Sequence, residues 1–484
     1  MSTGLDRLLS APAVATVRDA LAPHTEQAWL VGGTVRDALL GREVRDIDVA
    51  IRASPEEGAR AVAKAVQGPA FQLSEAFGAW RTIDRREGWI CDVSRLQAET
   101  IEADLRLRDF SVNAMAVPLL GPDPELIDPA GGVRDLEERT LRVLGGPSVE
   151  SSAYARDPLR PLRLARLATE LGFEPEPRTE RLTRAAAALV ERASAERVFA
   201  ELRRIVIADR VVDGLELAER LGLVAVVLPE VDALHGVEQS PYHHLDVHGH
   251  TVEVLRQYLE IERDPEATFG ELAEPVAESL ATPLADELTH GQALRFGALL
   301  HDIGKPATRA VLPNGRVSFV GHDSVGEEMI GAVCRRLRAS ERLRTYLGAL
   351  TRHHLVLGFM VHEQPLSRAE VYRYMTTCSP VELEVTVLSC ADRLATRGRN
   401  ADDAISAHLE LARELAKEAL AWRANGPPRP PVRGDELAAE LGIPVGPEIG
   451  ALLGRLTEAA FTGEATTRDE ALALARRLRH NPES

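Results

Sequence analysis

The first 150 residues alternate short apolar runs with glycine turns, a pattern typical of a mixed α/β fold. Three apolar runs, at residues 28–31, 47–51 and 89–93, are rich in Val, Ile, Leu and Trp and predict strands. Residues 55–66 place Ala and Val at helical spacing and predict a helix. We therefore expect an α/β head at the N-terminus.

Beyond residue 147 the pattern changes to Leu, Ala, Arg and Glu recurring at helical spacing as far as the C-terminus. Four prolines within residues 425–432 predict a linker before a short terminal segment. The length of 484 residues also exceeds the roughly 250 to 300 residues that one hydrophobic core supports. We expect four parts: an α/β head (1–150), an all-α neck (151–235), a histidine-rich helical region (236–425) and a C-terminal helical tail (426–484).

Composition narrows the class of protein. The chain is 45% apolar and 27% charged, as in folded globular proteins, and has neither a signal-peptide pattern nor an apolar run of membrane length. We expect a cytoplasmic protein without membrane contact.

Its four cysteines form no CxxC pair and predict reduced, packed thiols. The net charge of −17 argues against a surface that coats nucleic acid, but residues 156–210 hold twelve arginines against nine acidic residues, so any RNA site is expected there.

A glycine turn forms the first candidate binding feature. Gly32 and Gly33 join the strand at 28–31 to a helix, so free backbone N–H groups and a helix N-terminus face one spot. This geometry suits a triphosphate, although a plain tight turn is an equal alternative for Gly-Gly alone.

Two spaced aspartates follow the turn. Asp46 and Asp48 fall on the same face of the next predicted strand, because side chains alternate along a strand. Such a pair suits two-metal phosphoryl transfer, and the alternative for an isolated pair is a solvated strand edge. Asp92, on the strand at 89–93, is a candidate third catalytic carboxylate or a surface aspartate.

Residues 30–41, 46–48, 104–116 and 127–136 together resemble the motifs of the bacterial, class II tRNA nucleotidyltransferases, the CCA-adding enzymes, and of their poly(A) polymerase relatives. The resemblance implies a polymerase-β-type nucleotidyltransferase head in which Asp46 and Asp48 hold Mg²⁺. Leu107 departs from the family pattern, which usually has arginine there. The resemblance further implies nucleotide-binding roles for Gly32, Gly33, Arg36 and Arg108.

Residues 157–166 carry an acid and arginines spaced three apart, which makes each a neighbour of the next along a helical ridge. A carboxylate plus a guanidinium fits the Watson–Crick edges of cytosine and adenine but not those of uracil and guanine. We expect Asp157 and Arg160 to read the base, and the resemblance implies that Arg163 and Arg166 hold phosphates. A surface helix with salt bridges is the alternative.

Two further observations concern this helical region. Arg156 stands where the family usually has glutamate, which places a positive charge beside the expected base-reading acid. Residues 195–202 resemble the family's next helical motif and so tie the neck to the head.

Eleven of the fourteen histidines lie between residues 235 and 362, which marks a distinct module. His301 and Asp302 close an apolar helix predicted at 294–303, where both side chains can reach one metal ion. The order of His250, His301, Asp302 and Asp392 resembles the HD phosphohydrolase superfamily, which implies that these four are the ligands of a second divalent metal. Imidazole and carboxylate ligands suit Ni, Mn, Co, Fe or Mg.

Further donors near this set are His322 and His354, and residues 242–251 add more histidines. A metal-bound water would present hydroxide to a phosphoester. Related CCA-adding enzymes combine a similar module with phosphatase or cyclic phosphodiesterase activity, so an HD phosphohydrolase activity is expected here.

The resemblance implies template-independent addition of CCA to the tRNA 3′ end from CTP and ATP, by attack of the 3′ hydroxyl on the α-phosphate. The alternatives are an A-adding, CC-adding or poly(A)-adding enzyme of the same family, and an HD metal phosphohydrolase whose N-terminal domain only binds nucleotide or RNA. The expected partners are tRNA, CTP and ATP, and no obligate protein partner is evident from the sequence.

Overall fold

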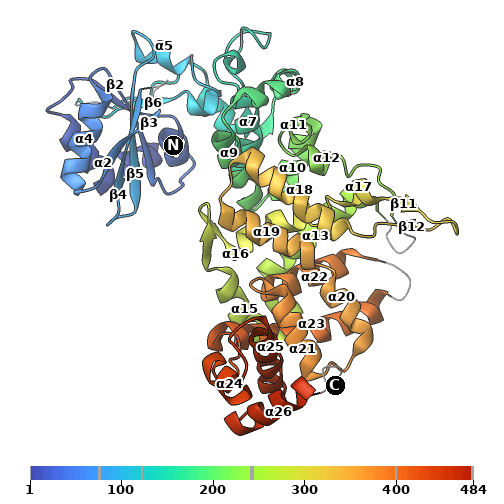
Figure 1. The fold of residues 1–484 in the computed structure, drawn as a ribbon. Helices are drawn as coiled ribbons and strands as arrows, with labels where there is room; N and C mark the ends of the chain where they lie inside the picture. The colour runs from blue at the N-terminus through green and yellow to red at the C-terminus, as the bar shows by residue number, and fades with distance from the viewer. Residues whose placement is uncertain (1, 75–77, 122–123, 240–244, 398–400, 481–484) are drawn as a thin grey trace. The chain divides into compact units, whose positions relative to one another are not determined.

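The computed structural model describes residues 2–74, 78–121, 124–239, 245–397 and 401–480. The chain forms two compact units, Met1–Val227 and Leu228–Ser484 (Figure 1). The first unit contains the head and the neck helices that follow it, and the second contains the histidine-rich region and the tail.

The head is built on a six-stranded sheet with the order β3-β4-β5-β2-β1-β6. Strands β2 and β5 are parallel neighbours, and every other pair in this sheet is antiparallel. The predicted strands are confirmed with small extensions at their ends. The predicted ones are β1, β2 and β5. The bounds of all six strands are β1 Ala28–Val31, β2 Asp46–Ile51, β3 Ala70–Ser74, β4 Ala79–Asp84, β5 Trp89–Arg95 and β6 Ala116–Pro118.

Helix α4, Pro55–Val66, has the predicted bounds and packs against β4 and β5 and against helix α2, Pro12–Leu21. Close packing depends on Gly58, because a Cβ added there would lie 3.0 Å from a methyl group of Leu21 and 3.1 Å from one of Ile51. The other head helices are α1 Ser2–Leu9, α3 Gly33–Leu39, α5 Ile101–Leu105 and α6 Gly132–Glu137.

In the neck, helix α7 packs against α9 and α10. Helix α7 begins at Arg160, so Pro161 lies in its first turn, where the missing N–H has no cost. Asp157 therefore precedes the helix and is not part of the continuous ridge that we predicted. The bounds are α7 Arg160–Leu171, α8 Pro177–Ala186, α9 Ala195–Ile207, α10 Val211–Arg220 and α11 Leu223–Val227.

The second unit is assembled around helix α22, most of whose side chains are buried. Helices α13, α16, α19, α20, α21 and α23 all contact it. The bounds are α13 Val247–Arg263, α16 His290–Leu300, α18 His322–Leu337, α19 Glu341–His353, α20 Val356–Met360, α21 Arg368–Cys378, α22 Glu382–Ala395 and α23 Ala401–Asn425. The shorter helices are α12 Pro229–Asp232, α14 Pro265–Phe269, α15 Ala273–Leu280 and α17 Lys305–Thr308.

The tail has its own apolar core, formed by α24 Gly434–Leu441, α25 Pro447–Thr462 and α26 Arg468–His480. Helix α23 ends at Asn425, where the proline-rich segment begins, as expected for a linker. Phe461 of α25 contacts Tyr372 and Trp422, and the Arg368 guanidinium lies 4.1 Å from the Phe461 ring centroid. These contacts attach the tail to α21 and α23.

The expectation of a helical chain beyond residue 147 is confirmed, with five short strands among the described helices. With β7, which precedes residue 147, they form three two-stranded sheets, and strands of two or three residues are too short to produce a period-two pattern. They pair β7 Thr140–Leu141 with β8 Glu174–Pro175, β9 Pro283–Ala285 with β10 Leu288–Thr289, and β11 Ala310–Val311 with β12 Val317–Ser318.

All four cysteines are free and buried, as expected for packing residues. Among the described helices, none is both long enough and apolar enough to cross a lipid bilayer.

Glu384 on α22 is fully buried and held by two partners. One carboxylate oxygen lies 2.7 Å from His290 Nδ1, and Arg423 of α23 donates to both oxygens. Burial by itself would raise the pKa of Glu384, but His290 and Arg423 outweigh burial and lower it. The pairing therefore joins α16, α22 and α23 through one buried charge.

We expect Glu384→Gln to lower the free energy of unfolding by about 2 kcal/mol, because it removes a buried charge-assisted hydrogen bond and leaves Arg423 with Glu382 as its remaining carboxylate partner. The pKa of Glu384 is lower in the folded than in the unfolded chain, so its stabilising effect is present above the unfolded value and is lost as the pH falls. Denaturant unfolding at pH 7 and pH 4 measures both effects, with the exposed Glu414→Gln as control. Equal stability of the two variants at pH 7 would contradict the prediction.

Candidate active site and metal centre

Strand β2 presents its two aspartates on one face. Ile47 and Val49 are buried in the core, so Asp46 and Asp48 point to the opposite side, as predicted. Asp48 is the direct partner of Asp92 in the parallel β2–β5 pairing, which brings the third carboxylate beside it. The sheet therefore gathers all three predicted catalytic carboxylates on neighbouring strands.

Thr34 fixes this arrangement and was not predicted. Its buried hydroxyl donates to the Asp46 carbonyl at 3.0 Å and accepts from the Asp48 N–H at 2.7 Å. The first turn of α3 is thereby tied to the backbone on both sides of Ile47. A hydroxyl directly after the glycine turn was the only signal for this role in the sequence.

The glycine turn opens toward the carboxylates. Gly32 has φ 66° and ψ −129°, a conformation that residues with a side chain rarely adopt. A Cβ added there would lie 2.9 Å from an Arg108 nitrogen and 3.4 Å from Asp48 Oδ2, and one added at Gly33 would lie 3.5 Å from Arg36 and from Asp48. Both glycines thus allow the two arginines and the Asp48 carboxylate to approach the turn closely.

Asp92 differs from the other two aspartates in having a cationic partner. Arg81 of β4 donates to both of its oxygens, each at 2.7 Å. Arg81 was missed by the sequence analysis because its position beside Asp92 arises from antiparallel β4–β5 pairing.

Asp48 has a strongly perturbed proton affinity. Burial raises its pKa to about 7, the neighbouring charges of Asp92 and Asp46 add to the rise, and Arg108 and Arg36 oppose it. The main cause is burial of the carboxylate, and the two neighbouring arginines do not offset burial together with the two neighbouring carboxylates. A divalent cation with oxygen ligands, such as Mg²⁺, would supply the missing positive charge, so the residues present fit that ion.

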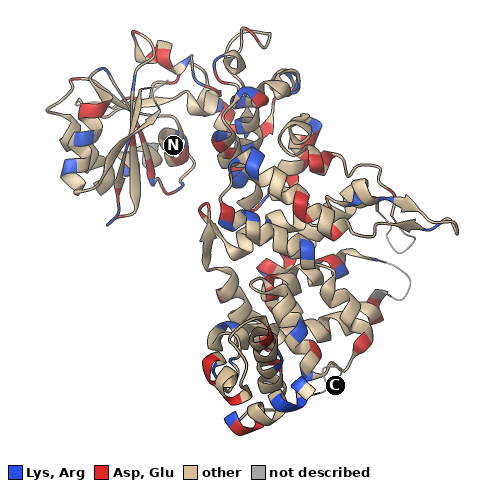
Figure 2. Cartoon of the chain, viewed as in Figure 1, with Lys and Arg blue, Asp and Glu red and all other residues tan. Residues whose placement is uncertain are grey.

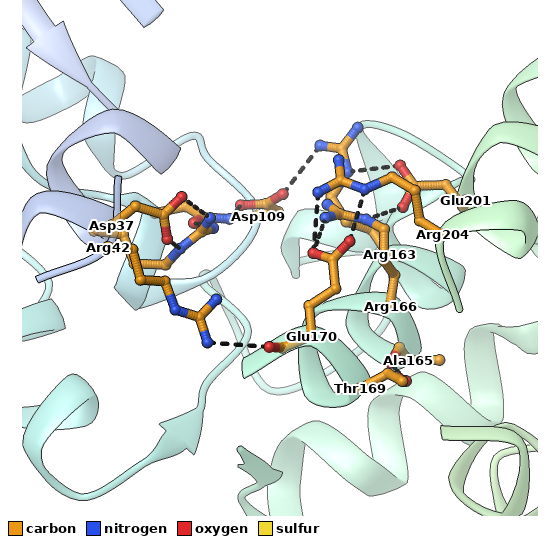
Figure 3. Close-up of polar contacts among 12 residues, drawn as sticks. Asp37, Arg42, Asp109, Arg163, Ala165, Arg166, Thr169, Glu170, Glu201 and Arg204 are labelled. Carbon is orange, nitrogen blue, oxygen red and sulfur yellow. Dashed lines mark hydrogen bonds and ion pairs between the residues drawn. The ribbon is translucent and has the colours of Figure 1, made fainter. Parts of the chain in front are cut away.

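A ladder of ion pairs crosses from the head to the neck (Figure 3). Arg36 donates to Asn113, and Asn113 donates to Asp109. Asp109 in turn accepts from Arg163 of α7 at 3.0 Å. Arg160 and Arg163, together with hydrogen bonds from Asn113 and Arg163, outweigh burial and lower the pKa of Asp109, so it stays ionised.

The ladder continues within the neck through two glutamates. Glu201 of α9 accepts from Arg163 at 3.4 Å and from Arg166 at 2.5 Å. Glu170 then accepts from Arg166 at 2.6 Å and from Arg204 at 2.6 Å. Glu201 and Glu170 were not predicted, and they hold the expected phosphate-binding arginines in place.

Asp157 and Arg160, which we expect to read the base, each have other partners in the structure. Asp157 accepts from Arg197 of α9 at 2.6 Å and from the Leu159 N–H at 3.1 Å. One nitrogen of Arg160 donates instead to the carbonyls of Leu107, Arg108 and Ala153. The reason is that Asp157 lies before the start of α7, so the three-residue helical spacing does not apply to it.

These groups nevertheless share one cavity of about 1040 Å³, hereafter the active cavity. Its lining includes every site residue that the sequence analysis proposed for the head and the neck, and also Arg81, Arg197, Glu201 and Arg204. Those predicted residues are Gly32, Gly33, Arg36, Asp46, Asp48, Asp92, Arg108, Asp157, Arg160, Arg163 and Arg166.

The second unit gathers the predicted histidines and aspartates around Asp302. His301 Nε2 lies 3.1 Å from Asp302 Oδ2, and His250 Nε2 lies 3.8 Å from the same oxygen. His250 also lies 3.0 Å from Asp392 Oδ1. The four predicted ligands therefore come together from α13, the end of α16 and α22.

His322 and His354 belong to the same centre. Their Nε2 atoms lie 3.4 Å and 3.8 Å from Asp302 Oδ1, on the side away from His301. Two ligand groups thus share Asp302, one with His250 and His301 and one with His322 and His354. The histidines predicted at positions 243 and 244 lie outside the described residues.

The hydrogen bonds of these rings prepare them for a metal. In His301, His322 and His354, Nδ1 lies 2.7 to 2.9 Å from a carbonyl oxygen one turn earlier, which leaves Nε2 as the free lone pair. Among the described residues, His301 Nε2 and Asp302 Oδ1 are buried without a hydrogen-bond partner. Buried polar atoms in this state fit a bound divalent cation. Lys305, 2.7 Å from Asp302, was not predicted and supplies the nearest positive charge.

The sheet with its carboxylate face and the arginine-lined cavity define a nucleotidyltransferase, here with an HD-type metal centre in the same chain. Models of the poly A polymerase head domain, of the probable RNA and SrmB-binding site of polymerase A, and of the HD domain match residues 28–142, 172–234 and 247–397.

Two relatives match almost the whole chain. The A-adding tRNA nucleotidyltransferase of Deinococcus radiodurans is 36% identical over 95% of this chain and 97% of its own, and the CC-adding tRNA nucleotidyltransferase of Thermus thermophilus is 34% identical over 93% of each. A solved CCA-adding enzyme in its apo form has the same fold, with a TM-score of 0.62, 22% identity, and coverage of 97% of this chain and 94% of that one. The chain belongs to the tRNA nucleotidyltransferase family.

We expect the Mg²⁺ concentration for half-maximal nucleotide transfer to increase as the pH falls below 7. The pKa of Asp48 is about 7, so below that pH a metal ion must displace a proton from it, and the apparent affinity falls by up to about tenfold per pH unit. Mg²⁺ titrations of initial rate at pH 6, 7 and 8 measure this. A requirement that stays constant over that range would show that Asp48 is already ionised at pH 6.

Proposed function

We propose that this enzyme adds CCA to the 3′ end of tRNA from CTP and ATP without a nucleic-acid template. The observation that carries the proposal is the active cavity, which combines a three-carboxylate face, a glycine turn beside two arginines, and the acid Asp157 with guanidinium groups around it. The A-adding and CC-adding relatives carry out parts of the same addition. We place the reaction in the cytoplasm, with tRNA and nucleotides as the partners.

In this mechanism Asp46 and Asp48 would hold Mg²⁺, and the bound ion would supply positive charge to the α-phosphate and the RNA 3′ hydroxyl. Arg36 and Arg108, on either side of the glycine turn, bind the phosphates of the incoming nucleotide and stabilise the charge of the departing pyrophosphate. Asp92, oriented by Arg81, stands beside Asp48 as the third carboxylate.

Base choice belongs to the neck side of the active cavity. The Asp157 carboxylate accepts the exocyclic amino group that cytosine and adenine share, and a guanidinium donates to the adjacent ring nitrogen. Uracil and guanine present the reverse order and are rejected. Arg160 is the donor that the family motif implies, and Arg197 already contacts Asp157. Arg163 and Arg166, fixed by Glu201, neutralise phosphates.

The first test incubates the purified full-length chain with a tRNA lacking its 3′ CCA, Mg²⁺, CTP and ATP, and reads the sequence added. We expect CCA. Asp46→Asn and Asp48→Asn should each lower kcat by about two to three orders of magnitude, since each removes a charge that stabilises the transition state. Asp469→Asn, whose carboxylate is 93% exposed in the tail, is the matched control.

Separate incubations with tRNA ending before the CCA and with tRNA ending in CC distinguish the products. Addition of A alone, CC alone or a long A tract would replace the proposal with the corresponding narrower or processive enzyme. Absence of extension by the unaltered chain would refute nucleotide transfer to tRNA altogether.

We also propose that the second unit is an HD phosphohydrolase centre. His250, His301, Asp302 and Asp392 would hold a divalent ion, whether Ni, Mn, Co, Fe or Mg, and His322 with His354 offers a second position that shares Asp302. The bound ion would lower the pKa of a water for attack on a phosphoester. Lys305 lies beside Asp302 and neutralises charge on the bound phosphate.

This second activity is tested with the full-length chain loaded with Mn²⁺ or Ni²⁺. His301→Ala should weaken metal binding by at least the roughly 10–100-fold that loss of an outer-shell partner costs, and should abolish hydrolysis of 2′,3′-cyclic AMP and p-nitrophenyl phosphate. His24→Ala, an exposed histidine of the head, is the control. Metal content by mass spectrometry separates the two steps, and full metal content without hydrolysis in the unaltered chain would refute the activity but not the site.

A further inference from the structure

A second, smaller cavity of about 400 Å³ lies in the first unit, beside the C-terminal end of α7. Three arginines from distant parts of the sequence line it: Arg42 after α3, Arg139 before β7, and Arg210 before α10. We call it the arginine pocket. Its acidic lining residues are Glu170 and Asp209.

The positive charge of the arginine pocket exceeds its negative charge. The Glu170 carboxylate is already neutralised by Arg166 and Arg204, outside this pocket. One nitrogen of Arg42 donates to the Glu170 carbonyl at 3.1 Å, and Figure 3 shows this contact. Arg139 has no side-chain hydrogen bond or ion pair with any residue that the structure describes. A guanidinium without a partner at the wall of a cavity is available to an anion.

The pocket is also shaped around its arginines. Arg210 lies against Gly172, the residue that ends α7, because a Cβ added there would be 2.4 Å from an Arg210 nitrogen. Gly172 also has φ 68°. The helix end therefore requires glycine both for this backbone conformation and for the close approach of Arg210. Arg210 pairs with Asp213 through its Nε, at 2.8 Å.

The arginine pocket adjoins the active cavity. Arg42 lines the pocket, and the next residue, Glu43, lines the active cavity. Glu170 lines the pocket, while both of its carboxylate partners, Arg166 and Arg204, line the active cavity. A polymer whose end lies in the active cavity can therefore reach the pocket with its adjoining units.

We propose that the arginine pocket binds a backbone phosphodiester of the RNA whose 3′ end is being extended. The inference rests on the proposed function for the RNA substrate. Guanidinium groups bind phosphate oxygens in bidentate fashion, and Arg139 and Arg42 offer unused nitrogens there. The phosphates of the incoming nucleotide already have Arg36 and Arg108 beside the carboxylates. An acidic chain with a net charge of −17 needs such local arginines to hold RNA.

Figure 2 shows basic segments concentrated on the neck helices α7 to α9, which fits RNA contact on this part of the first unit. The competing explanation is that the three arginines only cap the negative end of α7. That explanation accounts for Arg42, which reaches a carbonyl in the last turn, but leaves Arg139 without a role.

The test compares Arg139→Gln, Arg42→Gln and the double variant with Arg181→Gln, an exposed neck arginine that lines neither cavity. The dissociation constant for a tRNA lacking its 3′ CCA is measured by titration at several KCl concentrations. Each pocket substitution should weaken binding severalfold and reduce the slope of log affinity against log salt by about 1, the value for one lost phosphate contact. The KM for CTP should not change.

Thermal unfolding of each variant separates binding from capping. Arg139→Gln should retain the unfolding temperature of the unaltered chain, whereas a capping role would lower it and leave the salt slope unchanged. Equal slopes for the double variant and Arg181→Gln would overturn the proposal, and so would a rise in the KM for CTP that parallels the loss of tRNA affinity. If the unaltered chain binds tRNA with this slope but extends none, the proposed function fails while the phosphate site stands.

Discussion

The parallel pairing of β2 with β5 is the constraint on which the active cavity depends. It places Asp48 directly opposite Asp92, with Asp46 two residues away on the same face, and so concentrates like charges where water is scarce. Such an arrangement is unfavourable unless positive charge is close by. The neighbouring arginines compensate only part of it, and a divalent cation held by these carboxylates would supply the remainder.

Pairing of opposite charges also connects the head to the neck. Asp109 belongs to the head, yet its strongest partner is Arg163 on α7, and Glu201 of α9 binds the same arginine. These ion pairs join side chains of the head, α7 and α9, which fixes side chains that single surface ion pairs would leave mobile. Arg36 of the head and Arg163 and Arg166 of the neck are therefore positioned relative to one another by one continuous ladder.

In the second unit, hydrogen bonds to histidine rings orient their nitrogens toward Asp302. Three of its rings use Nδ1 on a carbonyl of the preceding turn, so Nε2 is directed at Asp302, and the Nε2 atoms of His322 and His354 also lie 3.3 Å from each other. The histidines occur at helix ends or on helices that pack around α22, where the fold supplies those carbonyls. Both sites of the chain thus place unsatisfied ligand atoms on rigid elements, which is the arrangement that a bound cation requires.

The sequence by itself determined the strands at 28–31 and 47–51, the helix at 55–66, the shared face of Asp46 and Asp48, and the membership of His250, His301, Asp302 and Asp392 in one set. These follow from local periodicity, turn chemistry and motif order, which are encoded within short segments. Only the tertiary structure decided that Arg81 holds Asp92, that Arg197 rather than Arg160 contacts Asp157, and that Thr34 ties α3 to β2. Those contacts join segments up to forty residues apart along the chain, and they depend on strand pairing and helix packing that local patterns do not specify.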